Sequence, residues 1–208
     1  MASTLTNRET EIKLPVSDLS ALLGSLQDLG AVGRGRVLEQ NTLYDTPEFD
    51  LRRAGCLLRL RLETPAGSSL VPPGLASAVL TSKAPPGGER HTAGRRAAKP
   101  RYKERLEREL TVQRPARWSH TLEILGFRPG FRYQKYRTSF RLSGLHVDLD
   151  ETPVGNFLEL EGLPKAIERV ASALGYTHRD FSRATYWELY NADCQRKGRV
   201  LGNMMFDT

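Results

Sequence analysis

The sequence has few of the residues that build disulfide scaffolds, zinc sites or membrane spans. Its two cysteines, Cys56 and Cys194, lie far apart and form no C-x-x-C or zinc-ligand pattern. No apolar run approaches the roughly 18–20 residues that a membrane span requires, and the polar N-terminus lacks the apolar core of a signal peptide. We therefore expect free thiols, a reducing cytoplasmic location and no membrane partner.

Histidines are also scarce, and the four in the chain are scattered. No G-x-S-x-G sequence surrounds any serine. Both findings argue against a histidine metal site and against Ser/His/Asp nucleophilic chemistry.

The 208 residues carry 31 lysines and arginines against 24 aspartates and glutamates, which gives a net charge of +7. This basic excess favours anionic partners such as phosphorylated small molecules, nucleic acid or acidic membranes. The composition is otherwise that of an ordinary globular protein. Without repeats or a clean linker, we expect one domain over residues 1–192 and a loose C-terminal tail over residues 193–208.

Hydrophobic periodicity and turn residues predict eight strands and four helices. The expected strands cover residues 10–14, 37–45, 56–63, 78–83, 101–112, 132–142, 145–150 and 156–161. The expected helices cover residues 17–29, 115–125, 163–174 and 182–192. The Pro/Gly-rich stretches at 64–76 and 84–101 are predicted to be loops.

Charged and apolar residues alternate along most of these strands, so the charges gather on one face. The charged residues of this face are Glu9, Glu11 and Lys13; Arg59 and Arg61; Arg105, Glu107 and Glu109; Lys135 and Arg137; Asp148 and Asp150; Glu159 and Glu161. An antiparallel sheet with one solvated face would show the same alternation. Many of the pairs are like-charged, however, and such pairs cost stability unless an ion lies between them.

A closed barrel accounts for the same pattern. Eight strands are enough to close around one small ligand, and amphipathic helices would then cover the apolar outer face. Paired carboxylates suit divalent cations, and paired arginines suit phosphate oxygens. The fold class expected is therefore α+β, an eight-stranded antiparallel closed barrel, or tunnel, with a charged lumen and helices packed outside.

The ordered motifs resemble the CYTH domain, or triphosphate tunnel metalloenzyme, superfamily over residues 8–190. The motifs that carry the resemblance are residues 9–13 (ETEIK), 44–47 (YDTP), 57–61 (LLRLR), 81–83 (TSK), 105–109 (RLERE), 135–137 (KYR), 148–150 (DLD), 155–161 (GNFLELE) and 185–189 (TYWEL). The resemblance implies a tunnel that binds a triphosphate with its basic residues and two divalent cations with its acids. Family members include triphosphatases of several kinds and class IV adenylyl cyclases.

Roles follow from the resemblance and from charge. Glu9, Glu11 and Lys13 are the expected catalytic residues. The triphosphate is expected to contact Lys13, Arg59, Arg61, Lys83, Arg105, Lys135, Arg137 and, from the C-terminal helix, Arg183. The expected metal ligands are Glu9, Glu11, Glu107, Asp148, Glu159 and Glu161. A set made only of carboxylates suits Mg²⁺ or Mn²⁺, and two ions are expected.

The sequence thus predicts a metal-dependent hydrolase of inorganic, nucleoside or organic triphosphates, in which water attacks the terminal phosphorus. One alternative is a class IV type adenylyl cyclase, and another is a non-catalytic polyphosphate- or nucleic-acid-binding module. The expected partner is a small-molecule triphosphate rather than nucleic acid, because no nucleic-acid fold signature accompanies the basic loop. The chain is expected to be a monomer or a homodimer.

Overall fold

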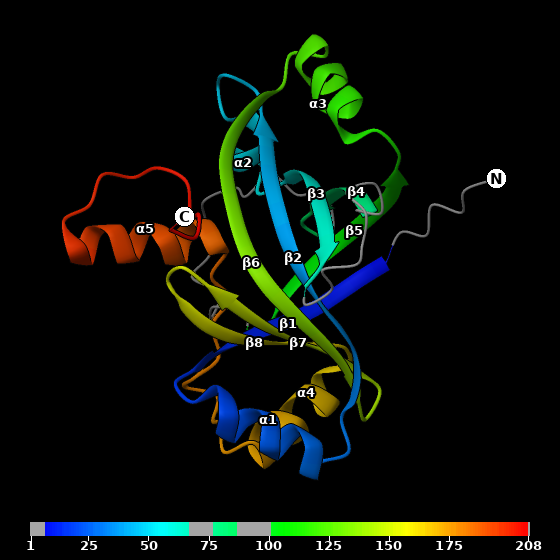
Figure 1. Cartoon of the computed structure of the whole chain (residues 1–208), viewed down its shortest axis with the longest axis vertical. Coiled ribbons are helices and arrows are strands. Elements are labelled where there is room, and N and C mark those ends of the chain that lie inside the picture. Colours follow the sequence, from blue (N-terminus) through cyan, green and yellow to red (C-terminus); the bar gives the residue numbers. More distant parts are fainter. Residues whose placement is uncertain (1–6, 67–76, 87–100, 208) are drawn as a thin grey trace.

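The computed structural model describes residues 7–66, 77–86 and 101–207, which form eight strands and five helices (Figure 1). The strands are β1 (Asn7–Val16), β2 (Val32–Asp45), β3 (Leu57–Pro65), β4 (Ser77–Ala84), β5 (Lys103–Val112), β6 (Arg128–Leu142), β7 (Leu145–Thr152) and β8 (Gly155–Glu161). The helices are α1 (Leu19–Asp28), α2 (Asp50–Arg53), α3 (Pro115–Ile124), α4 (Pro164–Ala173) and α5 (Tyr186–Lys197).

The eight strands close into one antiparallel barrel. Their order around it is β1-β5-β4-β3-β2-β6-β7-β8, and β1 completes the ring because it pairs with both β5 and β8. Glu9 lies opposite Arg105 in the first of these pairs, and Lys13 lies opposite Glu159 in the second. The predicted α+β tunnel with outer helices is confirmed, and the alternative of an open sheet with one solvated face is wrong.

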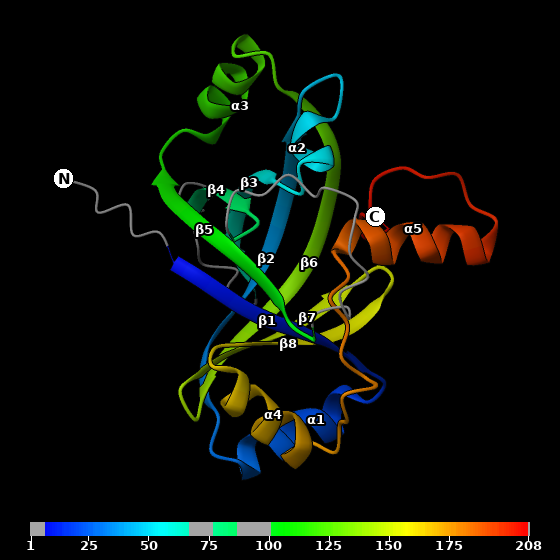
Figure 2. The ribbon, with the colours of Figure 1, turned by 180° about the vertical axis from the view of Figure 1, so that it is seen from behind.

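Apolar side chains of the strands point outwards and pack beneath the helices. Ile12 of β1, Val147 of β7 and Leu160 of β8 are fully buried in the largest core cluster. Leu26 of α1 and Ile167 of α4 join this cluster, and the two helices lie side by side at one end of the molecule (Figure 2). Burying each such side chain contributes roughly 1.5–3 kcal/mol, so these helices hold the barrel closed on this side.

A second cluster covers the outer side of β3, β4 and β5. Leu60, Ala78 and Val112 are buried there against Leu122 of α3, which lies at the opposite end of the molecule from α1 and α4 (Figure 1). α3 begins at Pro115, as predicted, because the fixed φ of proline suits the first helical position.

α5 begins at Tyr186, later than the predicted start at residue 182. Thr185 and Glu188 form a capping box, in which each side chain accepts a hydrogen bond from the backbone N–H of the other residue. The helix continues past the predicted end to Lys197 and stops at Gly198, whose φ of 63° is left-handed.

The C-terminal segment is fixed to the barrel. The Met204 N–H donates to the Arg132 carbonyl at 3.0 Å, and the Gln134 N–H donates to the Met204 carbonyl at 2.9 Å. The Met204 side chain is fully buried. Of the segment expected to form a loose tail, residues 193–197 continue α5, and Met204 is attached to β6.

Other differences from the expected elements are local. α2 was not predicted, because four residues are too short to show helical periodicity. β2 begins at Val32, earlier than predicted, and its register against β6 shifts between Gly33 and Gly35. Most of the loops predicted at 64–76 and 84–101 lies outside the described residues. Within the described part of the chain, no helix has the length and apolar character needed to span a membrane.

Candidate active site: a charged tunnel

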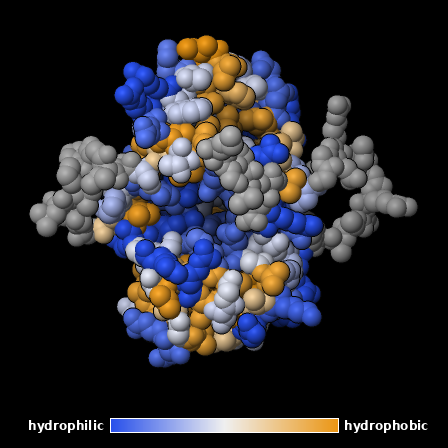
Figure 3. Space-filling view, turned by 90° about the vertical axis from the view of Figure 1, so that its right-hand side faces the viewer, coloured by the Kyte–Doolittle hydropathy of each residue, from blue (hydrophilic) through white to orange (hydrophobic). Residues whose placement is uncertain are grey.

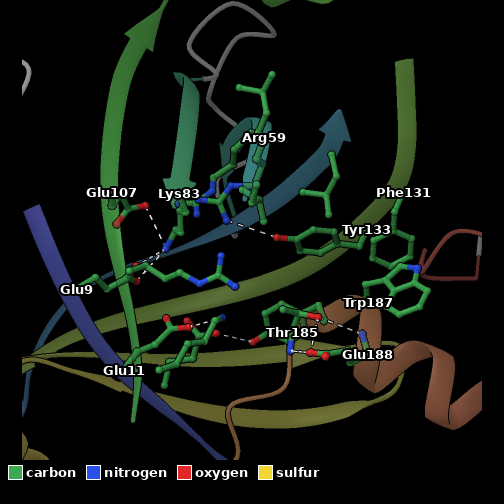
Figure 4. A pocket seen from close by; sticks show the side chains of 18 of the residues that line it. Glu9, Glu11, Arg59, Lys83, Glu107, Phe131, Tyr133, Thr185, Trp187 and Glu188 are labelled. Carbon is green, nitrogen blue, oxygen red and sulfur yellow. Dashed lines mark hydrogen bonds and ion pairs between the residues drawn. The ribbon is translucent and has the colours of Figure 1, made fainter. Parts of the chain in front are cut away.

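The interior of the barrel is a charged cavity of about 1240 Å³. Side chains alternate across a strand, so the residues that do not pack beneath the helices face this cavity. Figure 3 shows a central hollow with mainly hydrophilic walls, and Figure 4 shows the side chains inside.

The cavity gathers nearly all the predicted site residues. Those that line it are Glu9, Glu11, Lys13, Arg59, Arg61, Lys83, Arg105, Glu107, Lys135, Arg137, Asp148, Glu159 and Glu161. Arg183 precedes α5 and is not among the described residues that line the cavity. The helix contributes Tyr186 in its place.

Glu9 and Glu11 of β1 lie among the lysines of neighbouring strands. The Lys83 Nζ donates to Glu9 at 2.6 Å and lies 3.1 Å from Glu107, and the Lys103 Nζ donates to Glu11 at 2.7 Å. Burial, together with the charges of Glu11 and Glu107, raises the pKa of Glu9 to about 8 in spite of Lys83. Burial also opposes ionisation of Glu11, but Lys13 and Lys103 outweigh it and hold its pKa below the usual value.

Glu161 of β8 interacts with the carboxylates of Glu11 and Glu107. Burial raises its pKa, and the charges of Glu107 and Glu11 add to this effect, while Lys83 opposes it. The four carboxylates, which we call the acidic group, are Glu9, Glu11, Glu107 and Glu161. Their mutual repulsion is the kind of interaction that a bound cation relieves.

A second cluster surrounds Arg137 of β6. Its guanidinium nitrogens lie 2.7 Å from Asp148, 2.6 Å from Asp150 and 2.5 Å from Glu159. Glu159 also lies 2.8 Å from the Lys13 Nζ. Burial disfavours the charge of Lys13, yet Glu159 and Glu11 raise the pKa of this lysine above its usual value.

The deepest part of the site is a buried ion network. Lys135 is 1% exposed and lies 3.3 Å from Glu39 and 2.8 Å from Asp150, both of which are fully buried. The Tyr186 hydroxyl donates to Asp150, and it lies 3.1 Å from Glu159. This contact fixes the first turn of α5 to the floor of the cavity.

The arginines of β3 have fewer carboxylate partners. Arg59 donates to the Thr81 hydroxyl at 3.2 Å and to the Tyr133 hydroxyl at 3.4 Å. Its Nε is buried and has no hydrogen-bond partner within the described residues. A buried donor of this kind can accommodate a phosphate oxygen. Arg61 lies 3.3 Å from Glu39 and 3.2 Å from Glu63, and Arg105 donates to the Gly55 carbonyl.

Sequence reasoning missed five residues of the site: Glu39, Asn41, Lys103, Tyr133 and Tyr186. Period-2 alternation was the available signal for three of them, because Glu39 and Asn41 alternate along β2 and Tyr133 shares a face of β6 with the predicted Lys135. Tyr186 was missed because the capping box of Thr185 and Glu188, which marks the true helix start, was not applied.

No group of three or more His, Cys, Asp or Glu side chains in the described ranges is already arranged to hold a metal ion. The chemistry of the acidic group nevertheless fits a divalent cation, because its donors are all carboxylate oxygens and because the charges of Glu11 and Glu107 add to burial in raising the pKa of Glu9. Asp148 and Glu159 are held by Arg137 and fit a cation only when that arginine turns to another anion.

Comparison with known proteins gives the family. Residues 7–186 match the CYTH domain. The chain belongs to the CYTH family. Members of this family are triphosphatase- and adenylyl cyclase-like enzymes, which are generally metal-dependent. No curated protein sequence is significantly similar to this CYTH protein.

Solved structures share its fold. The Pyrococcus horikoshii protein PH1819 has a TM-score of 0.69 and 23% identity, over 89% of this chain and 99% of the other. A candidate adenylate cyclase from Vibrio parahaemolyticus has a TM-score of 0.67 and 20% identity, over 90% and 99%. The candidate adenylyl cyclase HpAC1 from Hippeastrum, described as having a dominant triphosphatase activity, has a TM-score of 0.57 and 20% identity, over 93% and 97%.

Proposed function

We propose that this CYTH protein is a divalent-metal-dependent triphosphatase. The observation that carries the proposal is that one cavity inside the closed barrel holds both the acidic group and a set of lysines and arginines from several strands. Phosphate binding alone requires cations, whereas paired carboxylates point to metal binding as well. The Hippeastrum structure, which shares the fold, is described with the same activity.

The basic residues hold and orient the triphosphate in this proposal. Arg59 offers its unsatisfied Nε, and Lys83 and Arg137 exchange their present carboxylate partners for phosphate oxygens. Fixed cations around the phosphate chain stabilise the charge that develops during transfer, without reorganisation at the moment of reaction. Lys13, between Glu11 and Glu159, keeps its proton and remains a cation towards the substrate.

The carboxylates are the ligands of the cation in this proposal. Glu9, Glu11, Glu107 and Glu161 would hold a divalent ion, and Asp148 and Glu159 would hold a second once Arg137 has turned to the phosphate. When bound, such an ion neutralises phosphate charge and lowers the pKa of a coordinated water.

A substrate panel tests the function. Tripolyphosphate, ATP and thiamine triphosphate are each incubated with Mg²⁺ or Mn²⁺, and both phosphate and cyclic AMP are measured. We expect phosphate release from at least one substrate and none in EDTA. Glu11→Gln should remove most turnover, whereas Glu104→Gln should not, because Glu104 is a partly exposed residue of the neighbouring strand β5 that pairs with Arg8 and does not line the cavity. Full activity in EDTA, or cyclic AMP as the main product from ATP, would contradict the proposal.

A further inference from the structure

The cavity has an aromatic end that binding of a triphosphate chain does not use. Leu43 of β2, Phe131 of β6 and Trp187 of α5 line the cavity there, with Arg52 of α2 beside them. We call these residues the aromatic mouth. A neighbouring cavity of about 580 Å³ shares Arg61, Arg137 and Asp148 with the first, and its lining is mainly charged or polar. The apolar part of the lining therefore belongs to the first cavity, where it includes this mouth and also Leu57 and Leu58 of β3.

A planar group already lies on Trp187. The Arg52 guanidinium is 3.6 Å from the centroid of the indole ring. Arg52 is exposed and Trp187 is partly buried, so the guanidinium occupies the accessible face of the ring. A flat cation at stacking distance shows that this face accepts a planar group. An exposed arginine can move aside at little cost, because its charge stays hydrated.

The aromatic mouth lies in line with the phosphate-binding residues. Phe131, Tyr133 and Lys135 follow one another on the inner face of β6, so Phe131 lies roughly 13 Å along the strand from Lys135. Tyr133 joins the two regions, since its ring stacks on Phe131 with centroids 5.6 Å apart and its hydroxyl accepts from Arg59 at 3.4 Å. Figure 4 shows Phe131 and Trp187 beyond Tyr133, as seen from Arg59.

We propose that the aromatic mouth binds the planar heterocycle of an organic triphosphate, such as a nucleobase, stacked on Trp187 in place of the Arg52 guanidinium. A triphosphate held between Arg59 and Lys135 directs its organic substituent along β6 towards this mouth. The inference rests on the proposed function, because it assigns a class of substrate to the same cavity. Inorganic tripolyphosphate then fills only the charged part of the site.

Tryptophan fluorescence tests the stacking directly. The chain has two tryptophans, Trp118 on α3 and Trp187. In Trp118→Phe, which leaves Trp187 as the reporter, a non-hydrolysable ATP analogue should quench the emission strongly, and tripolyphosphate should quench it at most half as much. In Trp187→Phe, which leaves Trp118, neither probe should change the emission. Equal quenching of Trp187 by both probes, or none by the analogue at saturation, overturns the inference.

A second test measures the affinities of the ATP analogue and of tripolyphosphate by calorimetry. Stacking of a base on an aromatic side chain is worth about 1–3 kcal/mol, which corresponds to roughly five- to 150-fold in affinity. Trp187→Leu should therefore weaken binding of the ATP analogue at least fivefold more than binding of tripolyphosphate, and Trp187→Phe should keep most of the difference. Parallel titrations with thiamine triphosphate and with the ATP analogue show which of the two heterocycles the mouth binds.

The outcomes separate the two proposals. If tripolyphosphate does not bind the unmodified protein, the proposed function fails together with the inference. If tripolyphosphate binds but Trp187→Leu weakens both probes by the same factor, only the inference is overturned. All these measurements report binding, so they stand whichever reaction the site performs.

Discussion

At the residue scale, the cations of the tunnel are already occupied by acids of the same tunnel. Lys83 lies between Glu9 and Glu107, and Lys13 lies beside Glu159. A triphosphate therefore binds by replacing the carboxyl contacts of these lysines with phosphate contacts, and each replacement frees a carboxyl group for a cation. The charged groups that contact one another without a ligand are the same ones that would bind it.

The protonation of Glu9 makes metal binding depend on pH. Its raised pKa, about 8, means that the ligand-free protein carries a proton on Glu9 at neutral pH. A cation must displace this proton, so below the pKa its affinity should fall by about tenfold for each unit of pH. Calorimetric titration with Mn²⁺ at pH 6.5, 7.5 and 8.5 measures this. In Glu9→Gln the pH dependence should largely disappear, and an unchanged dependence in that variant would assign the proton to another group.

Lys135 is the residue whose loss should cost most stability. Lys135→Met removes the ammonium group that Glu39 and Asp150 share and leaves these buried carboxylates to the guanidinium groups of Arg61 and Arg137, which should cost about 3–5 kcal/mol of unfolding free energy. Adding Glu39→Gln removes one of the two buried negative charges that Lys135 balanced and should recover part of the loss. Denaturant unfolding of the single and double variants checks this prediction, with the exposed Lys165→Met as the control. Additive effects of the two substitutions would argue against a coupled network.

At the element scale, the N-terminal cap of α5 positions a residue of the site, because Tyr186 directly follows Thr185. Thr185→Ala removes the cap and should cost about 1 kcal/mol, or roughly 2–4 °C in Tm. It should also lower kcat/KM, by roughly three- to tenfold, because Tyr186 in the same turn contacts Asp150 and Glu159.

A matched cap gives the control for this prediction. Asp18 caps α1 by accepting a hydrogen bond from the Ala21 N–H, and α1 packs on the outside of the barrel. Asp18→Ala should lower Tm by a similar amount and leave kcat/KM unchanged, as kinetics on both variants would show. Equal kinetic losses in the two variants would mean that α5 acts only through global stability.

The elements also show what sequence reasoning can and cannot find. Strands with charges in repeated pairs, such as Arg59 and Arg61, were found because period-2 alternation fixes which side chains share a face. Glu39 was missed because its neighbours on that face, Asn41 and Leu43, are uncharged. Which basic side chain pairs with which acidic one depends on the register between distant strands and on closure of the barrel. Local sequence patterns do not determine either.

At the scale of the whole molecule, ligand binding should raise thermal stability. Tripolyphosphate with Mg²⁺ at 100 times its Kd adds about 2.7 kcal/mol by linkage, which corresponds to a Tm increase of roughly 5–10 °C for a chain of this size. Differential scanning fluorimetry measures the shift. Orthophosphate at the same concentration should do much less, because it cannot contact at once residues as far apart as Arg59 and Arg137, which lie opposite Leu43 and Val37 of β2. Equal shifts would show that the cations do not form one extended site.

Closure of the barrel by β1 has a consequence for synthesis on the ribosome. The first strand finds its partners only in β5 and β8 (Figure 2), whose residues Arg105 and Glu159 are made long after Glu9 and Lys13. At about 5–20 residues per second, β1 waits roughly 7 to 30 seconds before its last partner is translated. Throughout that time Ile12 and Leu14, fully buried in the finished protein, have no native strand to pack beside. The first strand to be synthesised is thus among the last to complete its pairing. The rate of translation sets how long its apolar side chains remain available for aggregation.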